Sequence, residues 1–241
     1  MNPFWIEPDW PAPANIRAAS TLRGGGHSRG VFDSLNLGAH VGDDPDAVRS
    51  NRQRLRQELS VPAEPVWLHQ VHGSRVICAH APGDATGDAA VTDRAGTVCA
   101  VMTADCLPIL LCNRKGTKVA AVHAGWRGLA GGVVEAAVSA LGDSDLLAWM
   151  GPAIGPSAFE VGEDVLQAFT ERLGDCGEAF TPGAEGRWHA DIYRLARTIM
   201  GQMGVKAVYG GEDCTYSDPE RFFSYRRDGQ TGRMATLIWR E

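Results

Sequence analysis

Three short segments that lie far apart in the chain offer two histidines and one cysteine as possible metal donors. The donors are His72, Cys106 and His123, separated by 34 and then 17 residues. These separations are too long for a zinc finger, so the donors must come from different elements of a folded core. Two imidazoles and a thiolate suit zinc, and three protein ligands leave a fourth position open for water or substrate. Because seven His and six Cys allow such triples by chance, the surrounding sequence matters.

Short apolar strands and amphipathic helices are predicted around these donors. Residues 118–123 predict a buried strand that ends at His123, and residues 128–141 predict a helix rich in Ala and Val. Asp44 can cap a helix in which Pro45 takes the first position, where no backbone hydrogen bond is lost. A strand that stops at a donor and leads into a helix places the donor at the end of a sheet, where open α/β sheets form their sites.

The remaining pattern continues this alternation. Strands are predicted over residues 146–150, 205–209 and 236–239, helices over 163–173 and 191–203, and strand-like content over 66–79. Such alternation predicts an α/β-type fold. No repeat, low-complexity tract or linker interrupts it, so we expect a single domain over residues 1–241.

Composition and charge exclude several classes of protein. The net charge of −6 offers no general attraction for nucleic acid or for an acidic membrane surface. The first residues lack the basic and apolar regions of a signal peptide, and no apolar run approaches the roughly 18 residues of a membrane span. The six cysteines show no regular disulfide spacing, so most are expected to be small buried side chains. We therefore expect a cytoplasmic enzyme, and a monomer.

Each candidate donor has a structural alternative. His69 and His72 are three residues apart, and on a strand that spacing directs their side chains to opposite faces. Only one of them is then expected to enter a shared site. Cys106 has the alternative of a buried thiol, but Pro108 stiffens the chain after it, which suits a fixed ligand. Asp105 either accepts an N–H from a ligating histidine or caps the following turn.

Five stretches of the chain carry motifs in a recognisable order. They are Ser34–Asp44 with Asn51-Arg52, Trp67–Val76, Gly87–Asn113, Val119–Gly132 and Cys214–Trp239. With these stretches, and above all with TADCLP and HAGWRG, the chain resembles the bacterial YfiH-like family, also called the laccase-domain or polyphenol-oxidase-like family. The chain departs from the family pattern at Ser157 and Ala158, where cysteines are expected.

The resemblance implies a zinc ion bound by His72, Cys106 and His123. It also implies a mixed α/β (α+β) fold, with a layered mixed sheet flanked by helices. It also implies an enzyme that acts on small purine nucleosides: phosphorolysis of adenosine, inosine, guanosine or methylthioadenosine, and deamination of adenosine to inosine. Zinc lowers the pKa of bound water to about 7, which suits attack on C6 of adenine. Asp105 is the first candidate to shuttle the proton.

Phosphorolysis also requires a cation that binds phosphate, and the rigid five-donor fork of arginine suits this role. The candidates are Arg127, Arg226 and Arg227, with an ordinary surface arginine as the alternative for each. If residues 226 and 227 lie on an extended segment, only one side chain points inward. We predict that Arg227 is the residue that binds and holds phosphate (the phosphate clamp), with Arg226 as the second choice.

Two further polar residues, Asn36 and Asp88, lie in the matched motifs. Both are candidates for contact with the ligand. An Asn before Leu-Gly is also a common turn residue.

Three other functions stay open at this stage. Two His and one Cys also suit copper, as in a polyphenol oxidase, although a laccase relay needs several coppers and more histidines. Cys106 could instead be the nucleophile of a hydrolase that edits peptidoglycan precursors. A binding protein without enzymatic activity would hold its metal through a fourth protein ligand.

Overall fold

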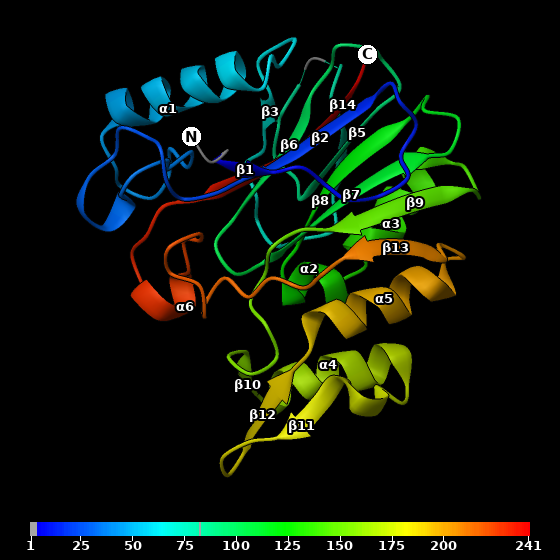
Figure 1. The fold of residues 1–241 in the computed structure, drawn as a ribbon. Helices are drawn as coiled ribbons and strands as arrows, with labels where there is room; N and C mark the ends of the chain where they lie inside the picture. The colour runs from blue at the N-terminus through cyan, green and yellow to red at the C-terminus, as the bar shows by residue number, and fades with distance from the viewer. Residues whose placement is uncertain (1–3, 82) are drawn as a thin grey trace.

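The computed structural model describes residues 4–81 and 83–241, and three β-sheets form its framework (Figure 1). The five-stranded sheet runs in the order β1 (Trp5–Ile6), β2 (Ile16–Thr21), β14 (Met234–Arg240), β6 (Cys99–Thr103) and β3 (Val66–Trp67). The six-stranded sheet runs β13 (Ala207–Gly210), β9 (Leu146–Met150), β7 (Leu107–Asn113), β8 (Val119–Ala124), β5 (Ala89–Thr92) and β4 (Val76–Cys78). The three-stranded sheet runs β10 (Glu160–Gly162), β12 (Arg187–Ala190) and β11 (Phe180–Pro182).

The two large sheets pack against each other through their apolar faces. Successive residues of a strand point to opposite faces, so β7 supplies Leu110 to the space between the sheets and Leu111 to the opposite face. Val101 of β6 and Ile238 of β14 enter the same space from the five-stranded sheet. Every residue of β7 and β8 is buried, which explains why both sequences are almost entirely apolar.

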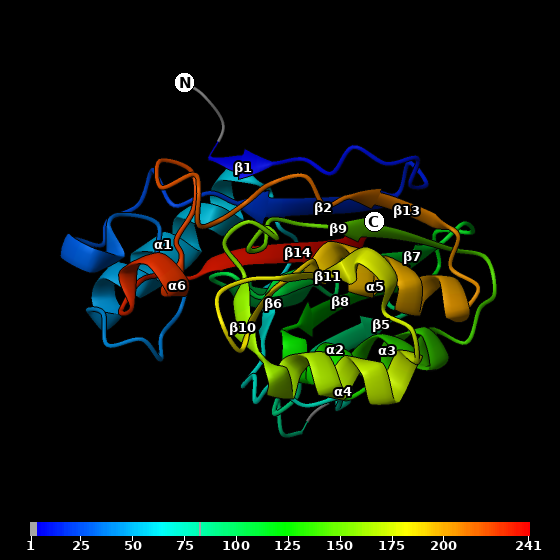
Figure 2. The same cartoon turned by 90° about the horizontal axis from the view of Figure 1, so that it is seen from below.

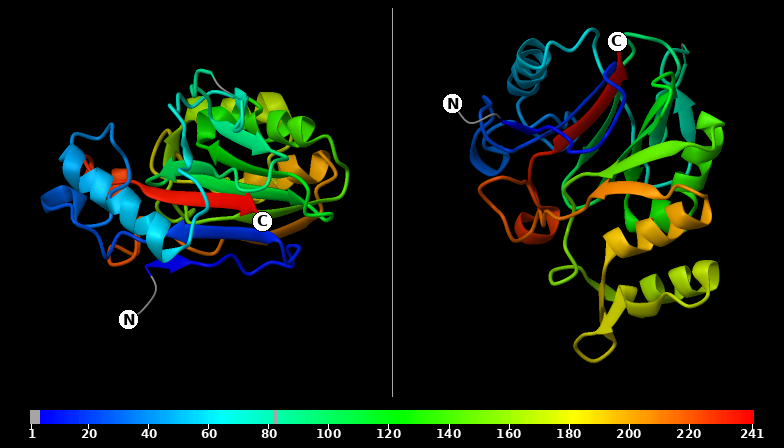
Figure 3. Two further views of the ribbon diagram at one scale, coloured as in Figure 1. Left: turned by 90° about the horizontal axis from the view of Figure 1, so that it is seen from above. Right: turned by 45° about the vertical axis from the view of Figure 1, so that its right-hand side comes forward.

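Helices cover the outer faces of both large sheets (Figure 3). Leu55 of α1 (Pro45–Glu58) packs on the five-stranded sheet. Two helices, α3 (Val133–Leu141) and α5 (Ile192–Gln202), cover the six-stranded sheet. Beyond α5, α4 (Glu163–Leu173) and the three-stranded sheet pack onto the same core, on the side away from α1 (Figure 2). The molecule therefore has helical layers outside two central sheets.

Four short elements complete the described chain. They are the helices α2 (Trp126–Ala130) and α6 (Tyr225–Asp228) and the 3₁₀ turns Gly30–Phe32 and Gly177–Ala179. Among the helices of residues 4–81 and 83–241, none has the length and apolar character that a membrane crossing requires.

The mixed α/β architecture predicted from the sequence is confirmed, and several elements have the predicted bounds. The strand over 146–150 and the helix over 163–173 match β9 and α4. Asp44 caps α1 by accepting from the Asp46 amide, with Pro45 at the first helical position. The alternating pattern was informative here because each element buries one face against a neighbour.

Two local predictions differ from the structure. The single helix expected over residues 128–141 is divided into α2 and α3, because Gly132 has a φ of 93°, a left-handed conformation that ends a helix. Residues 225–228 form the short helix α6 rather than an extended segment, and the side chain of Ser224 caps it by accepting from the Arg227 amide. The argument from strand alternation therefore does not apply to Arg226 and Arg227.

Candidate metal centre and its cavity

Two of the three predicted donors lie at one edge of the six-stranded sheet. Cys106 directly precedes β7, and His123 is the second-last residue of β8. These strands are antiparallel, and Pro108 lies opposite His123. Antiparallel pairing places the start of β7 beside the end of β8, which brings a thiol and an imidazole 17 residues apart into contact.

The third donor, His72, lies in the loop between β3 and β4 and has a left-handed backbone with a φ of 59°. The argument that strand alternation directs His69 and His72 to opposite faces therefore does not apply, because His72 lies in a turn. His69 forms an isolated bridge with Thr86, and its side chain is exposed. The ligand atoms of His72, Cys106 and His123 all lie within 4.8 Å of one another.

A fully buried carboxylate, Asp88, holds this arrangement. Its Oδ1 accepts from His123 Nδ1 at 2.8 Å and from the amide of His72 at 2.9 Å, and its Oδ2 accepts from the amide of Gly73 at 2.8 Å. Nδ1 of His123 is thus occupied, which leaves Nε2 to face the cluster. One side chain orients a donor imidazole and also fixes the loop that carries the second imidazole. The sequence pattern placed Asp88 as a ligand contact and did not show this role.

Gly125 explains why the HAGWRG segment needs a glycine after His123-Ala124. A Cβ atom at this position would lie 2.9 Å from Cys106 Sγ and 3.1 Å from His72 Cδ2. The contact with Cys106 is shorter than real Cβ atoms show, and the contact with His72 is tight enough that the ring would have to shift. A larger residue at this position would therefore displace the side chains of two donors.

The charges of the cluster stabilise the thiolate of Cys106, and His123 would release its proton when a metal binds. Burial by itself raises the pKa of Cys106, but the imidazoles of His123 and His72 outweigh it and lower the pKa to about 6. Burial lowers the pKa of His123, whereas the Cys106 thiolate and Asp88 raise it to about 9. Cys106 is therefore a thiolate at neutral pH, the form that coordinates metals. Two imidazoles and a thiolate at these separations fit a zinc or copper ion, and the site could bind a metal.

A cavity of about 410 Å³ lies over the cluster, within the usual size range of small-molecule sites. One group of lining side chains is apolar and belongs to, or packs on, the core of the six-stranded sheet: Trp126, Ile154, Phe159 and Ile192. A second group is polar or cationic and includes His40, Gln70 and Arg233. His40, Gln70 and Arg233 were not singled out in the sequence, where each lay among ordinary polar residues.

Asp105 lies beside the cluster and lines the cavity, but both of its carboxylate oxygens have protein donors. Oδ1 accepts from Thr215 Oγ1 and Oδ2 accepts from the amide of Arg226, each at 2.6 Å. Asp105 has a left-handed φ of 91°, so the chain turns sharply between it and Cys106. The carboxylate thus connects the turn before β7 to the C-terminal segment.

The three arginines predicted to bind phosphate have different environments. Arg127 lines the cavity, is exposed, and stacks on Trp126 with its guanidinium carbon 4.3 Å from the ring centre. Arg226 also lines the cavity and donates to the carbonyl of Glu160. Arg227 is not among the lining residues, and its guanidinium is occupied by carbonyl groups and the carboxylate of Asp228.

Asn36, the other predicted contact, is fully buried and does not line the cavity. Its Oδ1 accepts from the amides of Gly38 and Arg233, each at 2.9 Å, and its Nδ2 donates to Asp43. The side chain therefore fastens the loop before α1 to the start of β14. Through that contact it positions Arg233.

Comparison with known proteins identifies the family. The profile described as multi-copper polyphenol oxidoreductase laccase matches residues 17–241. The chain belongs to this family. The family also includes proteins named YfiH, in agreement with the resemblance seen in the sequence.

Several relatives of the family match over almost their full length. A protein named purine nucleoside phosphorylase from Pseudomonas aeruginosa is 56% identical, covering 98% of both chains. The Escherichia coli purine nucleoside phosphorylase YfiH is 52% identical, covering 97% of this chain and 98% of its own. A solved structure from Neisseria meningitidis is 48% identical with a TM-score of 0.95, covering 99% of this chain and all of its own. The YlmD structure from Geobacillus stearothermophilus is 33% identical with a TM-score of 0.94, covering 100% of this chain and 97% of its own.

Proposed function

We propose that this protein is a zinc-dependent purine nucleoside phosphorylase that also deaminates adenosine to inosine. The observation that carries the proposal is the cluster of His72, Cys106 and His123 at a cavity that joins apolar and cationic side chains. The names of the close relatives support phosphorolysis. We further propose that it acts in the cytoplasm, as a monomer, on adenosine, inosine, guanosine and methylthioadenosine.

The apolar group of the cavity suits the purine base. Trp126 and Phe159 offer aromatic surface, and Ile154 and Ile192 offer aliphatic surface. A flat, weakly polar base buried against them gains hydrophobic and dispersion energy. The base would then place its reactive carbon toward the cluster, while the ribose faces the polar group.

The metal would be bound by His72 Nε2, His123 Nε2 and Cys106 Sγ, with Asp88 holding the two histidines in place. When bound, zinc supplies a Lewis acid and lowers the pKa of a coordinated water, the chemistry that deamination needs. Asp105 holds the Cys106 turn in this proposal, because both of its oxygens already accept hydrogen bonds. Within the described residues a single cluster of this kind is found, whereas a multi-copper relay requires several, which favours zinc.

The test is a nucleoside panel assayed with and without inorganic phosphate, on protein purified without added copper. Free base and ribose 1-phosphate should form only with phosphate, and adenosine should yield inosine without it. A chelator should remove both activities, and zinc should restore them. Release of free base at the same rate with and without phosphate would contradict the proposal. So would activity that copper alone restores, together with oxidation of phenols.

A cysteine hydrolase is the second candidate, because a specific geometry favours it. Cys106, His123 and Asp88 form a thiol–imidazole–carboxylate series, with His123 Nδ1 donating to Asp88 at 2.8 Å. Such an enzyme would form an acyl-Cys106 intermediate on an amide substrate of the peptidoglycan-precursor class. Mass spectrometry of acid-quenched enzyme would detect that adduct, and full dependence of turnover on zinc would argue against it.

A further inference from the structure

The polar side of the cavity carries a half-buried arginine, Arg233, beside a histidine, His40. Both Arg233 and His40 line the cavity. Burial lowers the pKa of His40, and the cations of Arg233 and Arg52 lower it further. Burial also lowers the pKa of Arg233. The cation of Arg233 is therefore held here at an electrostatic cost, because burial lowers its pKa by more than nearby Cys106 and Asp105 raise it.

No carboxylate within the described residues neutralises this charge through an ion pair. The ion pairs of residues 4–81 and 83–241 include neither Arg233 nor Arg52. In Arg233, only Nη1 has acceptors there, the carbonyls of Thr231 and Gly232. Buried charges in proteins are normally paired, so a cation left unpaired beside a cavity indicates an anionic ligand.

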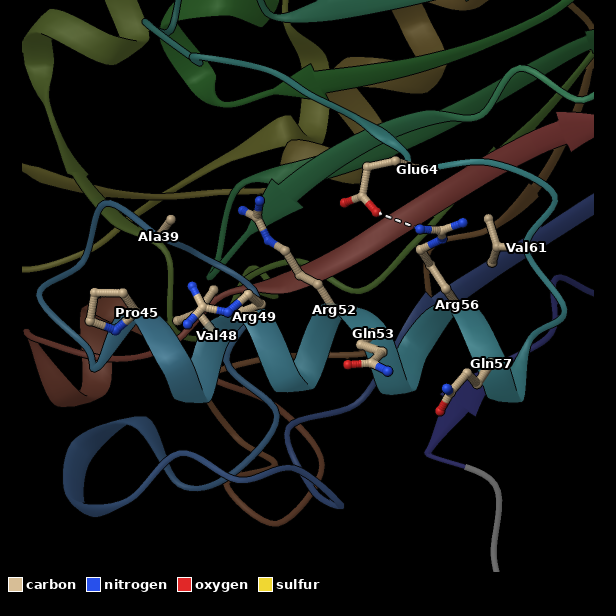
Figure 4. Close-up of a pocket in the computed structure, with 10 residues that line it drawn as sticks. All are labelled: Ala39, Pro45, Val48, Arg49, Arg52, Gln53, Arg56, Gln57, Val61 and Glu64. Carbon is tan, nitrogen blue, oxygen red and sulfur yellow. Dashed lines mark hydrogen bonds and ion pairs between the residues drawn. The ribbon is translucent and has the colours of Figure 1, made fainter.

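Arg52 stands behind this side of the cavity and is held rigidly. Its guanidinium donates twice to the carbonyl of Leu37, stacks 4.1 Å from the ring centre of Trp67, and contacts the sulfur of Met102, which lines the cavity. In Figure 4, Arg52 and Arg56 project from the same side of α1, and Arg56 is the one paired with Glu64. The side chain of Arg52 thus adds charge to the cavity without occupying it.

The segments that carry these cations are fixed to each other. Asn36 accepts the amide of Arg233, and the amide of Leu37 donates to the Arg233 carbonyl. The aliphatic part of the Arg233 side chain packs closely on Gly38, where a Cβ atom would lie 2.8 Å from Arg233 Cγ. The cations of Arg233 and Arg52 are therefore held in place by contacts with the loop before α1.

We propose that Arg233, with His40 beside it and Arg52 behind it, forms the subsite for inorganic phosphate, the second substrate of phosphorolysis. This inference rests on the proposed phosphorylase function and replaces Arg227 as the clamp. A phosphate dianion complements two fixed cations and takes the free donors of the Arg233 fork. Arg127 is the weaker choice, because it is exposed and stacked on Trp126.

The position suits the reaction. One oxygen of the dianion HPO₄²⁻ forms a bond to C1′ of the ribose while the bond from C1′ to the base nitrogen breaks. The electron pair of that bond leaves with the base, and the proton of the phosphate ends on the base. Arg233 holds the nucleophile on the polar side of the cavity, while the apolar group of side chains holds the leaving base.

The test compares Arg233→Lys with Arg127→Lys, two arginines that line the same cavity. In phosphorolysis of inosine, Arg233→Lys should raise the KM for phosphate about tenfold or more, because an ammonium lacks the planar fork. The KM for inosine, the zinc content and the phosphate-independent deamination of adenosine should stay within about twofold of wild type, because the charge and the stem are kept. Arg127→Lys should change the KM for phosphate by less than about threefold.

Direct binding of phosphate separates this inference from the proposed function. Broadening of the ³¹P NMR signal of inorganic phosphate should occur with wild-type protein and be lost in Arg233→Met, without any turnover. If wild-type protein cleaves no nucleoside but broadens the phosphate signal, and Arg233→Met does not, the phosphate subsite is supported and the proposed phosphorylase function is rejected. If the enzyme is active and Arg233→Lys leaves its KM for phosphate unchanged, the proposed subsite is wrong. The same holds if Arg127→Lys raises that KM equally. Should Arg233→Met fail to fold, Arg233→Lys, which keeps the charge but lacks the planar fork, should weaken the broadening, and unchanged broadening in that variant would reject the subsite.

Discussion

Asp88 and Asp105 are both buried next to the cluster of His72, Cys106 and His123, but their surroundings differ. Asp88 accepts hydrogen bonds from His123 and from the loop that carries His72, so all of its partners belong to the cluster region. Asp105 accepts from Thr215 and from the Arg226 amide, both in the C-terminal segment. One aspartate orients donors, and the other attaches a distant part of the chain.

The difference shows that closeness in sequence is a poor guide to the role of a carboxylate. Asp105 is adjacent to Cys106, yet its left-handed backbone turns its side chain toward the tail. Asp88 is 16 residues from His72 and 35 from His123, yet it contacts both. Burial raises the pKa of Asp88, but hydrogen bonds from His123 and from the Gly73 and His72 amides hold it below its ordinary value. The donors that reach a carboxylate decide its function.

The largest expected effect is on metal affinity. Asp88→Asn removes the charge that orients His123 and weakens the contacts that hold the His72 loop, so zinc affinity should fall about 10–100-fold. A competition titration with a chromogenic chelator measures it. Asp105→Asn is the matched control and should change zinc affinity by less than about threefold, because its partners lie outside the cluster. Equal losses in both variants would abolish the distinction between the two aspartates.

A smaller effect is expected on stability. Asp105→Asn replaces an acceptor by an NH₂ group that faces either Thr215 or the Arg226 amide, so the free energy of unfolding of metal-free protein should drop by about 1–3 kcal/mol. Denaturant unfolding measures this value. Thr215→Val removes one of the two hydrogen bonds and should cost about 1 kcal/mol. If Asp105→Asn left stability unchanged but reduced deamination strongly, Asp105 would be a proton shuttle after all.

The smallest effect concerns the pH dependence of Cys106. Its pKa is lowered to about 6, so in metal-free protein alkylation by iodoacetamide should be slow below pH 6, rise through it and level off above pH 7. An ordinary thiol rises near pH 8.5 instead. Asp88→Asn should move the midpoint upward by about one unit or less, because a neutral His123 stabilises the thiolate less. Peptide-resolved mass spectrometry follows the alkylation of Cys106. A lower midpoint in Asp88→Asn than in wild type, or a wild-type midpoint near pH 8.5, would show that His123 does not control the pKa of the thiol.

The sequence by itself indicated the layered fold, most elements and the three donors. Apolar runs such as those of β7 and β8 predict buried strands whatever their partners, because burial of their side chains drives folding locally. Capping by Asp44 and Pro45 is likewise a local property. The motifs around Cys106 and His123 identified the donors because they include the glycine and proline that shape the turns.

Only the tertiary structure decided which polar groups serve those donors. The contacts of Asp88, the attachment of Asp105 to Thr215, and the hydrogen bond from the Arg233 amide to Asn36 join residues between 15 and almost 200 positions apart. No periodicity encodes such pairs, because they depend on strand order and on loops whose backbone turns left-handed at His72 and Asp105. Arg227 stood out in the sequence for its neighbours, whereas in the fold its guanidinium is taken up by carbonyl groups, and Arg233 faces the cavity.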